Sequence, residues 1–129
     1  MTSTNEEFDK MITGAMDELP QKYIAGLQNV LITFEDFPTS EQRRRQNLQV
    51  WQTLFGLYEG IPRTKRGSNY NMVLPDKITL FKGPLEQASN TSDELHENIK
   101  RTLWHEIAHF YGLGHDRIHE LEHKHKDPS

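Results

Sequence analysis

The longest regular pattern in the sequence lies between residues 92 and 111 and is typical of an amphipathic helix. Thr91 and Glu94 have the spacing of a capping box, in which each side chain hydrogen-bonds a backbone N–H group at the helix start. Apolar residues then recur every four positions along one face, namely Leu95, Ile99, Leu103 and Ile107. The sequence therefore predicts a helix over roughly Ser92 to Tyr111.

A second helix is predicted near the N-terminus, over about residues 5–19. Thr4 and Glu7 form another capping box at its start, and Pro20 ends it. Its apolar residues recur at intervals of three and four and are expected to pack on the core: Phe8, Met11, Ile12, Ala15, Met16 and Leu19.

The segment between these helices is predicted to form a sheet. Strands are expected over Leu27–Phe34, Val50–Tyr58, Met72–Leu74 and Lys77–Phe81, with Gly56 as a possible bulge. The polar stretch Ser40–Asn47 is expected to be a surface excursion, and Gly83-Pro84 to close the strand region. We therefore expect an α+β fold, in which a small, mostly antiparallel sheet packs on two main helices.

The helix over 92–111 carries a group of residues suited to binding a metal ion. His105 and His109 are four residues apart, so their imidazoles project from one helix face and can share one ion. Glu106 is rotated by about 100° around the helix axis from His105, which places it beside the ion. That is the position of a general base for a metal-bound water.

A catalytic zinc needs a third protein ligand and an open position for water. Gly112 can end the helix in the left-handed conformation and Gly114 loosens the next turn, so that His115 can turn back toward the ion. The chain has no cysteine, which leaves imidazole and carboxylate as ligands for a transition metal. We expect Zn²⁺, although imidazole also suits other divalent ions.

Residues 53–121 resemble the small, single-domain zincin-like metallopeptidases of bacteria. The resemblance is carried by the segments LFGLYEGIP (54–62), LPDKITLF (74–81) and RTLWHEIAHFYGLGHD (101–116). It implies a minimal zincin fold, with His105 and His109 as ligands and Glu106 as the catalytic base. Many members carry Asp at the position of His115, so Asp116 is the alternative third ligand. The pattern is also similar to that of metzincins, but no Met follows His115 to form their Met-containing turn.

These features predict hydrolysis of a peptide or protein substrate by a water that zinc activates, with Glu106 accepting its proton. A first alternative is an endoribonuclease, because the HxxxHxxxxxH spacing is similar to that of small bacterial enzymes of ribosomal RNA maturation. Those enzymes have Gly at the position of Glu106, and the net charge of −4 does not favour RNA binding. A second alternative is an inert metal-binding module, since the chain has little material for a second cleft wall.

The length of 129 residues suits one domain, with about 116–129 as a tail or short helix. No nucleic-acid or membrane partner is expected, and the polar start of the chain makes the cytoplasm the expected location. The oligomeric state is open. The other candidate residues are expected to be solvated surface groups: His96, His119, His123 and His125, and the basic clusters 43–45 and 63–66.

Overall fold

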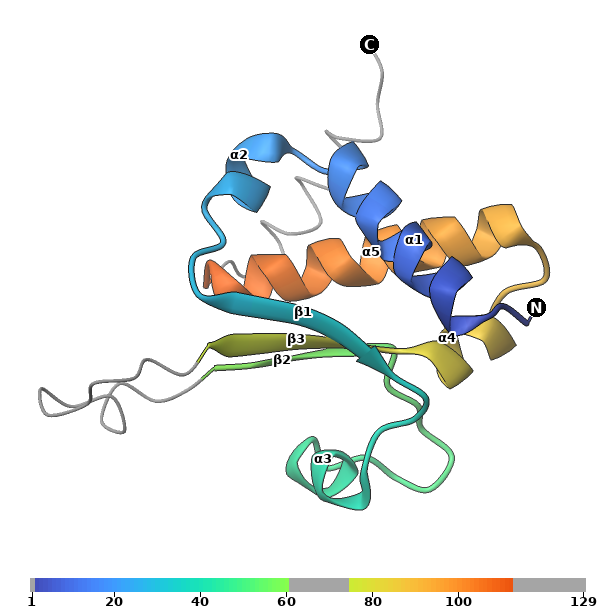
Figure 1. Ribbon diagram of the computed structural model, residues 1–129. Coiled ribbons are helices and arrows are strands. Elements are labelled where there is room, and N and C mark those ends of the chain that lie inside the picture. The colour runs from blue at the N-terminus through green and yellow to red at the C-terminus, as the bar shows by residue number, and fades with distance from the viewer. Residues whose placement is uncertain (1, 61–74, 113–129) are drawn as a thin grey trace, which may run out of the picture.

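The computed structural model describes residues 2–60 and 75–112 (Figure 1). These residues form five helices and three strands. In chain order the elements are α1 (Asn5–Glu18), α2 (Gln21–Ala25), β1 (Val30–Glu35), α3 (Ser40–Arg45), β2 (Gly56–Glu59), β3 (Asp76–Phe81), α4 (Lys82–Gln87) and α5 (Ser92–Phe110). Helices α1 and α5 lie on one face of the sheet, and α3 lies on the opposite side (Figure 1). The predicted α+β fold class is confirmed.

The three strands form one sheet in the order β1-β3-β2. β1 pairs with β3 in parallel, from Val30 opposite Asp76 to Glu35 opposite Phe81. β2 pairs with β3 in the antiparallel sense and lies at an edge. Among the residues that the structure describes, the sheet is therefore mixed, and the expected predominance of antiparallel pairing is not found. The long connection from β1 to β3 explains the difference, because it gives the chain the length needed for a parallel crossover.

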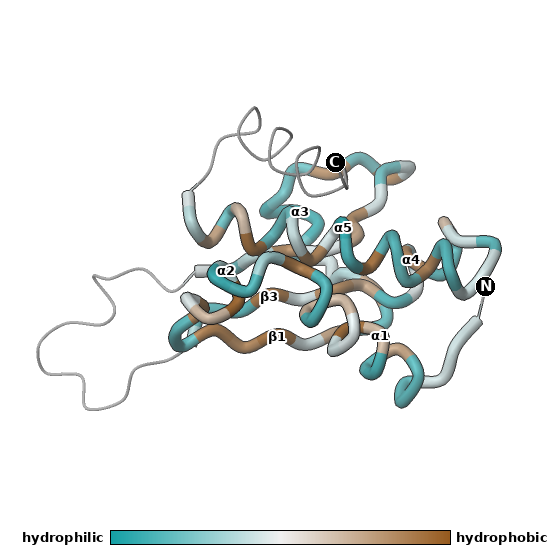
Figure 2. The backbone as a smooth tube through the Cα atoms, turned by 90° about the horizontal axis from the view of Figure 1, so that it is seen from above, coloured by the Kyte–Doolittle hydropathy of each residue, from teal (hydrophilic) through white to brown (hydrophobic). Residues whose placement is uncertain are grey.

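The core lies between α1, α5 and the sheet. The apolar stripes predicted for the two helices are both buried there, together with Ile78 and Leu80 of β3. Figure 2 shows how hydrophobic and hydrophilic residues alternate along α5, whereas β1 and β3 are mostly hydrophobic. The residues of α1 and α5 at the centre of the core are each at most 5% exposed: Phe8, Ile12, Ala15, Leu95, Ile99, Leu103 and Ile107.

Both predicted helix starts are observed. At α1, the Thr4 and Glu7 side chains each accept a backbone N–H of the other residue, at 3.0 Å. At α5, the Thr91 hydroxyl accepts the Glu94 N–H at 3.1 Å, but the Glu94 carboxylate accepts the Asn90 N–H at 2.7 Å. Only the threonine half of the second predicted capping box is therefore observed, because the Glu94 carboxylate accepts from the residue before Thr91.

The segment before β2 differs from the prediction. Ser40–Arg45 is a short helix, α3, whose Thr39 and Gln42 form a capping box. The Arg43 guanidinium then donates to the backbone carbonyls of Gln49 at 2.8 Å and Gln52 at 2.9 Å. The Gln52 N–H donates to the Gln49 carbonyl at 3.0 Å, so residues 49–52 form a turn, and the expected strand over 50–58 is restricted to β2. The loop leaves Trp51 81% exposed.

Two further boundaries have local causes. β1 begins at Val30, later than expected, because Asn29 has a φ of 56°, which is outside the strand region. Gly83-Pro84 lies in the first turn of α4, where proline is tolerated because its missing N–H would be unpaired there. The expected strand at 72–74 lies outside the described residues. Among residues 2–60 and 75–112, no helix is long and apolar enough to cross a membrane.

Candidate metal centre

The last two turns of α5 bring three potential metal-binding side chains together. His105, Glu106 and His109 each offer a ligand atom, and these atoms all lie within 4.8 Å of one another. The two imidazole rings have centroids 4.7 Å apart and are tilted by 52°. The i, i+4 spacing therefore has the geometric effect that the sequence predicts.

The three side chains differ in burial. Glu106 is 7% exposed, His105 is half-buried, and the His109 side chain is 40% exposed. The cluster thus has a buried carboxylate at its base and opens to solvent at His109. The two imidazoles are donors of the kind that zinc takes, the carboxylate lies beside them, and the open side leaves room for water or substrate.

The Glu106 carboxylate is held by β2. Its Oε1 accepts the backbone N–H of Tyr58 at 2.9 Å and lies 3.8 Å from Nδ1 of His109. Phe55 accepts the N–H of Phe81 at 2.9 Å, so the alternating pattern of an antiparallel pair directs the N–H of Tyr58 away from β3, toward α5. The edge of the sheet therefore fixes the orientation of the carboxylate.

Burial raises the pKa of Glu106 from 4.5 to about 7, because ionisation is unfavourable away from water. The hydrogen bond from the Tyr58 N–H favours the ionised form and opposes part of this increase. A carboxyl group with this pKa can both accept and return a proton near neutral pH, which is the property required of a general base.

A pocket of about 420 Å³ lies directly beside the cluster. It is formed between α5 and the segment that leads into β2, and it is lined by Thr53, Leu54, Phe55, Gly56, Arg101, Thr102, His105 and Glu106. Gly56 is paired regularly with Leu80 and is not a bulge. A Cβ at Gly56 would lie 2.6 Å from Cγ2 of Thr102, so glycine is what allows α5 to approach β2 this closely.

The C-terminal end of α5 is anchored to α2. The Tyr111 hydroxyl donates to the backbone carbonyl of Tyr23 at 2.6 Å, and it lies where a Cβ at Gly26 would be 2.2 Å away. Gly112 has a φ of 71°, the left-handed conformation expected for a residue that ends the helix. His115 and Asp116 lie outside the described residues, so the third ligand stays a prediction.

The remaining candidate residues lie elsewhere. Nε2 of His96 forms a hydrogen bond with the Glu18 carboxylate of α1, and the His96 side chain is partly buried, so it contributes to the packing of the two helices. Two carboxylates on the neighbouring strands are also hydrogen-bonded: Asp76 accepts the hydroxyl of Tyr58 at 2.8 Å, and Glu59 accepts the side-chain amide of Gln42 at 3.3 Å. His119, His123, His125 and residues 63–66 lie outside the described part of the chain.

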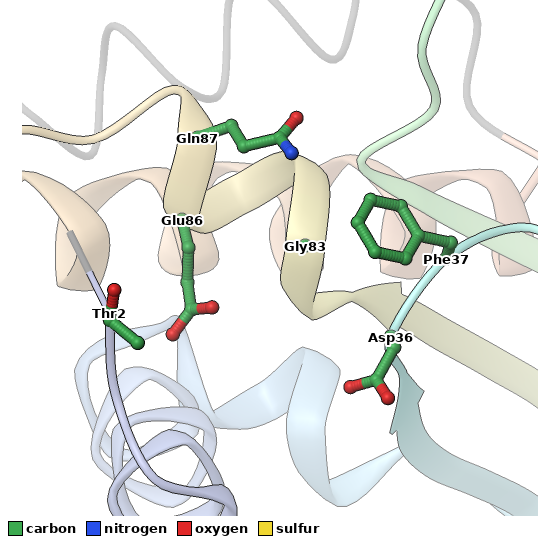
Figure 3. Close-up of a pocket in the computed structure, with 6 residues that line it drawn as sticks. All are labelled: Thr2, Asp36, Phe37, Gly83, Glu86 and Gln87. Atoms are coloured by element: carbon green, nitrogen blue, oxygen red, sulfur yellow. The ribbon is translucent and has the colours of Figure 1, made fainter.

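A second pocket of about 420 Å³ lies near the start of α4 (Figure 3). It is lined by Thr2, Asp36, Phe37, Gly83, Glu86 and Gln87. The Glu86 carboxylate is occupied by Ser3, whose hydroxyl donates at 2.6 Å, and by Lys82 at 3.5 Å. No histidine lines this pocket among the described residues, so its chemistry does not match that of the cluster on α5.

Sequence reasoning did not identify two features of the site. The Tyr58 N–H is a backbone donor, and its role cannot be identified from the type of residue at that position. Arg101 lies one turn before His105, and that spacing was the available signal for its place beside the cluster.

Comparisons with known proteins agree with this geometry. The sequence model of a family described as zincin-like metallopeptidase matches residues 27–125. A solved structure of a conserved hypothetical protein from T. thermophilus is similar in fold, with a TM-score of 0.58 and 20% sequence identity. The similarity covers 84% of this chain and 94% of that one. A search of curated proteins finds no match.

Proposed function

Because the chain belongs to the zincin-like metallopeptidase family, we propose that it is a zinc-dependent peptidase that uses Glu106 as its general base. One observation carries this proposal: a buried carboxyl with a pKa of about 7 lies against two histidines beside a pocket. Zinc as the metal and the cytoplasm as the location are parts of the proposal.

In this proposal, the residues of α5 have separate roles in metal binding and proton transfer. His105 and His109 hold the ion, with His115 or Asp116 as the third ligand. Zinc, when bound, supplies Lewis acidity that makes a water molecule acidic enough to react near neutral pH. Glu106 would accept the proton of that water on its Oε2 atom, while the Tyr58 N–H keeps Oε1 in place. The carboxyl then returns the proton to the leaving amine.

The substitution Glu106→Gln tests this assignment, because an amide of similar size cannot accept the proton. We expect the variant to bind zinc in the same ratio as the unaltered protein and to lose about 10²- to 10⁴-fold in peptide hydrolysis. Zinc content is measured by atomic emission, and hydrolysis is measured with a mixture of synthetic peptides.

Glu97→Gln is the matched control, since it makes the same chemical change on the same helix outside the pocket. It should keep both zinc and activity. Undiminished hydrolysis by Glu106→Gln would exclude Glu106 as the base. Cleavage of structured RNA, with every peptide left intact, would contradict the peptidase function itself.

A further inference from the structure

We propose that Arg101 gives the enzyme a preference for substrates that carry a carboxylate close to the bond that is cut. This inference rests on the peptidase function proposed above and adds the class of substrate. The carboxylate is either an Asp or Glu side chain or the free C-terminus of a short peptide, because both present the same group to a guanidinium.

The position of Arg101 is the first observation in favour. Arg101 and His105 are four residues apart on α5, so they lie on one side of the helix, about 6 Å apart along its axis. Both line the pocket beside the cluster of His105, Glu106 and His109. An extended peptide advances about 3.3 Å per residue, so a group at Arg101 belongs to a residue at or next to the scissile bond.

The charge of the pocket is the second observation. Arg101 is always protonated, Thr53 and Thr102 are neutral, and the Glu106 carboxylate is held by the backbone N–H of Tyr58. One turn before Arg101, Glu97 is paired with Lys100 at 3.0 Å. No carboxylate in residues 2–60 and 75–112 forms an ion pair with Arg101. The pocket is thus suited to an anion although the chain has a net charge of −4.

The walls of the pocket are the third observation. Leu54 and Phe55 line it together with the two threonines. These apolar side chains can contact the methylene groups of an acidic residue, while Arg101 binds its end. This combination favours a carboxylate on a short aliphatic chain over a bare inorganic anion.

The test measures the cleavage preference of the zinc-loaded full chain. A synthetic peptide library, varied at every position and prepared with free or amidated C-termini, is digested, and the cut sites are read by mass spectrometry. We expect about tenfold faster cleavage of peptides with a carboxylate at one fixed position next to the cut. Enrichment of Asp and Glu identifies the side chain, and dependence on the free C-terminus identifies the terminal carboxylate.

Three variants make the result specific to Arg101. Arg101→Gln should remove the preference, so that acidic and neutral peptides are cleaved at similar rates, and Arg101→Glu should shift the preference toward Lys and Arg. Arg44→Gln, an exposed residue of α3 outside the pocket, should keep the preference of the unaltered protein. The preference should also weaken at high salt.

Three outcomes would overturn the proposal. They are the absence of any preference for a carboxylate, a preference that persists in Arg101→Gln, and an equal loss of cleavage for all peptides in that variant. The last outcome would mean that Arg101 acts on the reacting carbonyl group.

A binding measurement separates this proposal from the peptidase function. Two peptide hydroxamates that differ only in a Glu or Gln side chain are titrated into the zinc-loaded protein and followed by calorimetry. If no peptide is cleaved, the peptidase function fails. Tighter binding of the Glu compound, lost in Arg101→Gln, would still support the carboxylate pocket, and equal binding would contradict it.

Discussion

At the scale of single residues, Glu106 links the chemistry of the site to the stability of the fold. Its folded-state pKa of about 7 lies above its ordinary value of 4.5, so the folded protein binds more protons than the unfolded chain between these pH values. The stabilisation that follows is fully present below about pH 4.5 and is lost as the pH rises through 7.

We therefore predict that the metal-free protein loses up to about 3 kcal/mol of its free energy of unfolding between pH 5 and pH 8 through this group. Glu106→Gln removes the titrating group and should lack this part of the pH dependence. Urea unfolding of both proteins in the presence of a chelator measures the difference. Parallel pH profiles for the two proteins would refute the elevated pKa.

At the scale of elements, the contact between α5 and β2 sets the shape of the site. Gly56→Ala would place a Cβ 2.6 Å from Cγ2 of Thr102 and 3.4 Å from Cγ of Glu106. We predict a destabilisation of about 1–3 kcal/mol from this overpacking, together with reduced peptide hydrolysis because the carboxylate proposed as the general base is displaced.

Two further variants serve as controls for the Gly56→Ala experiment. Adding Thr102→Ser removes the clashing methyl group and should restore most of the stability lost by Gly56→Ala. Gly14→Ala makes the same change in α1, where the nearest neighbouring atom would lie 3.4 Å away, and should be neutral or stabilising. Equal effects at the two glycines would show that the approach of α5 to β2 does not depend on Gly56.

The elements also show what could be predicted from the sequence. Helix α5 and its cluster were predictable because the cap, the apolar stripe and the two histidines all lie within one continuous segment. α3 was not, because its charged residues suggested a loop, and its stability depends on the Thr39–Gln42 cap and on Gln42, which is buried. The loop at Val50 and Trp51 was not predictable either, because apolar residues favour a strand. The hydrogen bonds that Arg43 donates to this loop cannot be inferred from the local sequence pattern.

At the scale of the whole molecule, a bound ion should stabilise the fold, because a ligand that binds only the folded state shifts the equilibrium toward it. We predict that zinc at about 100 times its Kd raises the free energy of unfolding by about 2.7 kcal/mol, with a matching rise in Tm. His105→Ala and His109→Ala should abolish this rise, whereas His96→Ala, away from the cluster, should retain it.

The same measurement identifies the third ligand. If His115 is the ligand, His115→Ala should weaken zinc binding strongly while Asp116→Ala leaves it nearly unchanged, and the reverse pattern would assign Asp116. Unchanged zinc affinity in both variants would exclude each of them and would contradict the ligand set proposed for the site.

The anchoring of Tyr111 over Gly26 has a consequence for how fast and how tightly an ion is captured. The exit of α5 is held by α2 before any metal arrives, so the chain leaves the two histidines from a fixed point and in a fixed direction. Coordination by His105 and His109 would then not have to order this end of the helix, so the entropy that such ordering costs would not be lost on binding. A tyrosine that touches no ion thereby sets part of the affinity for one.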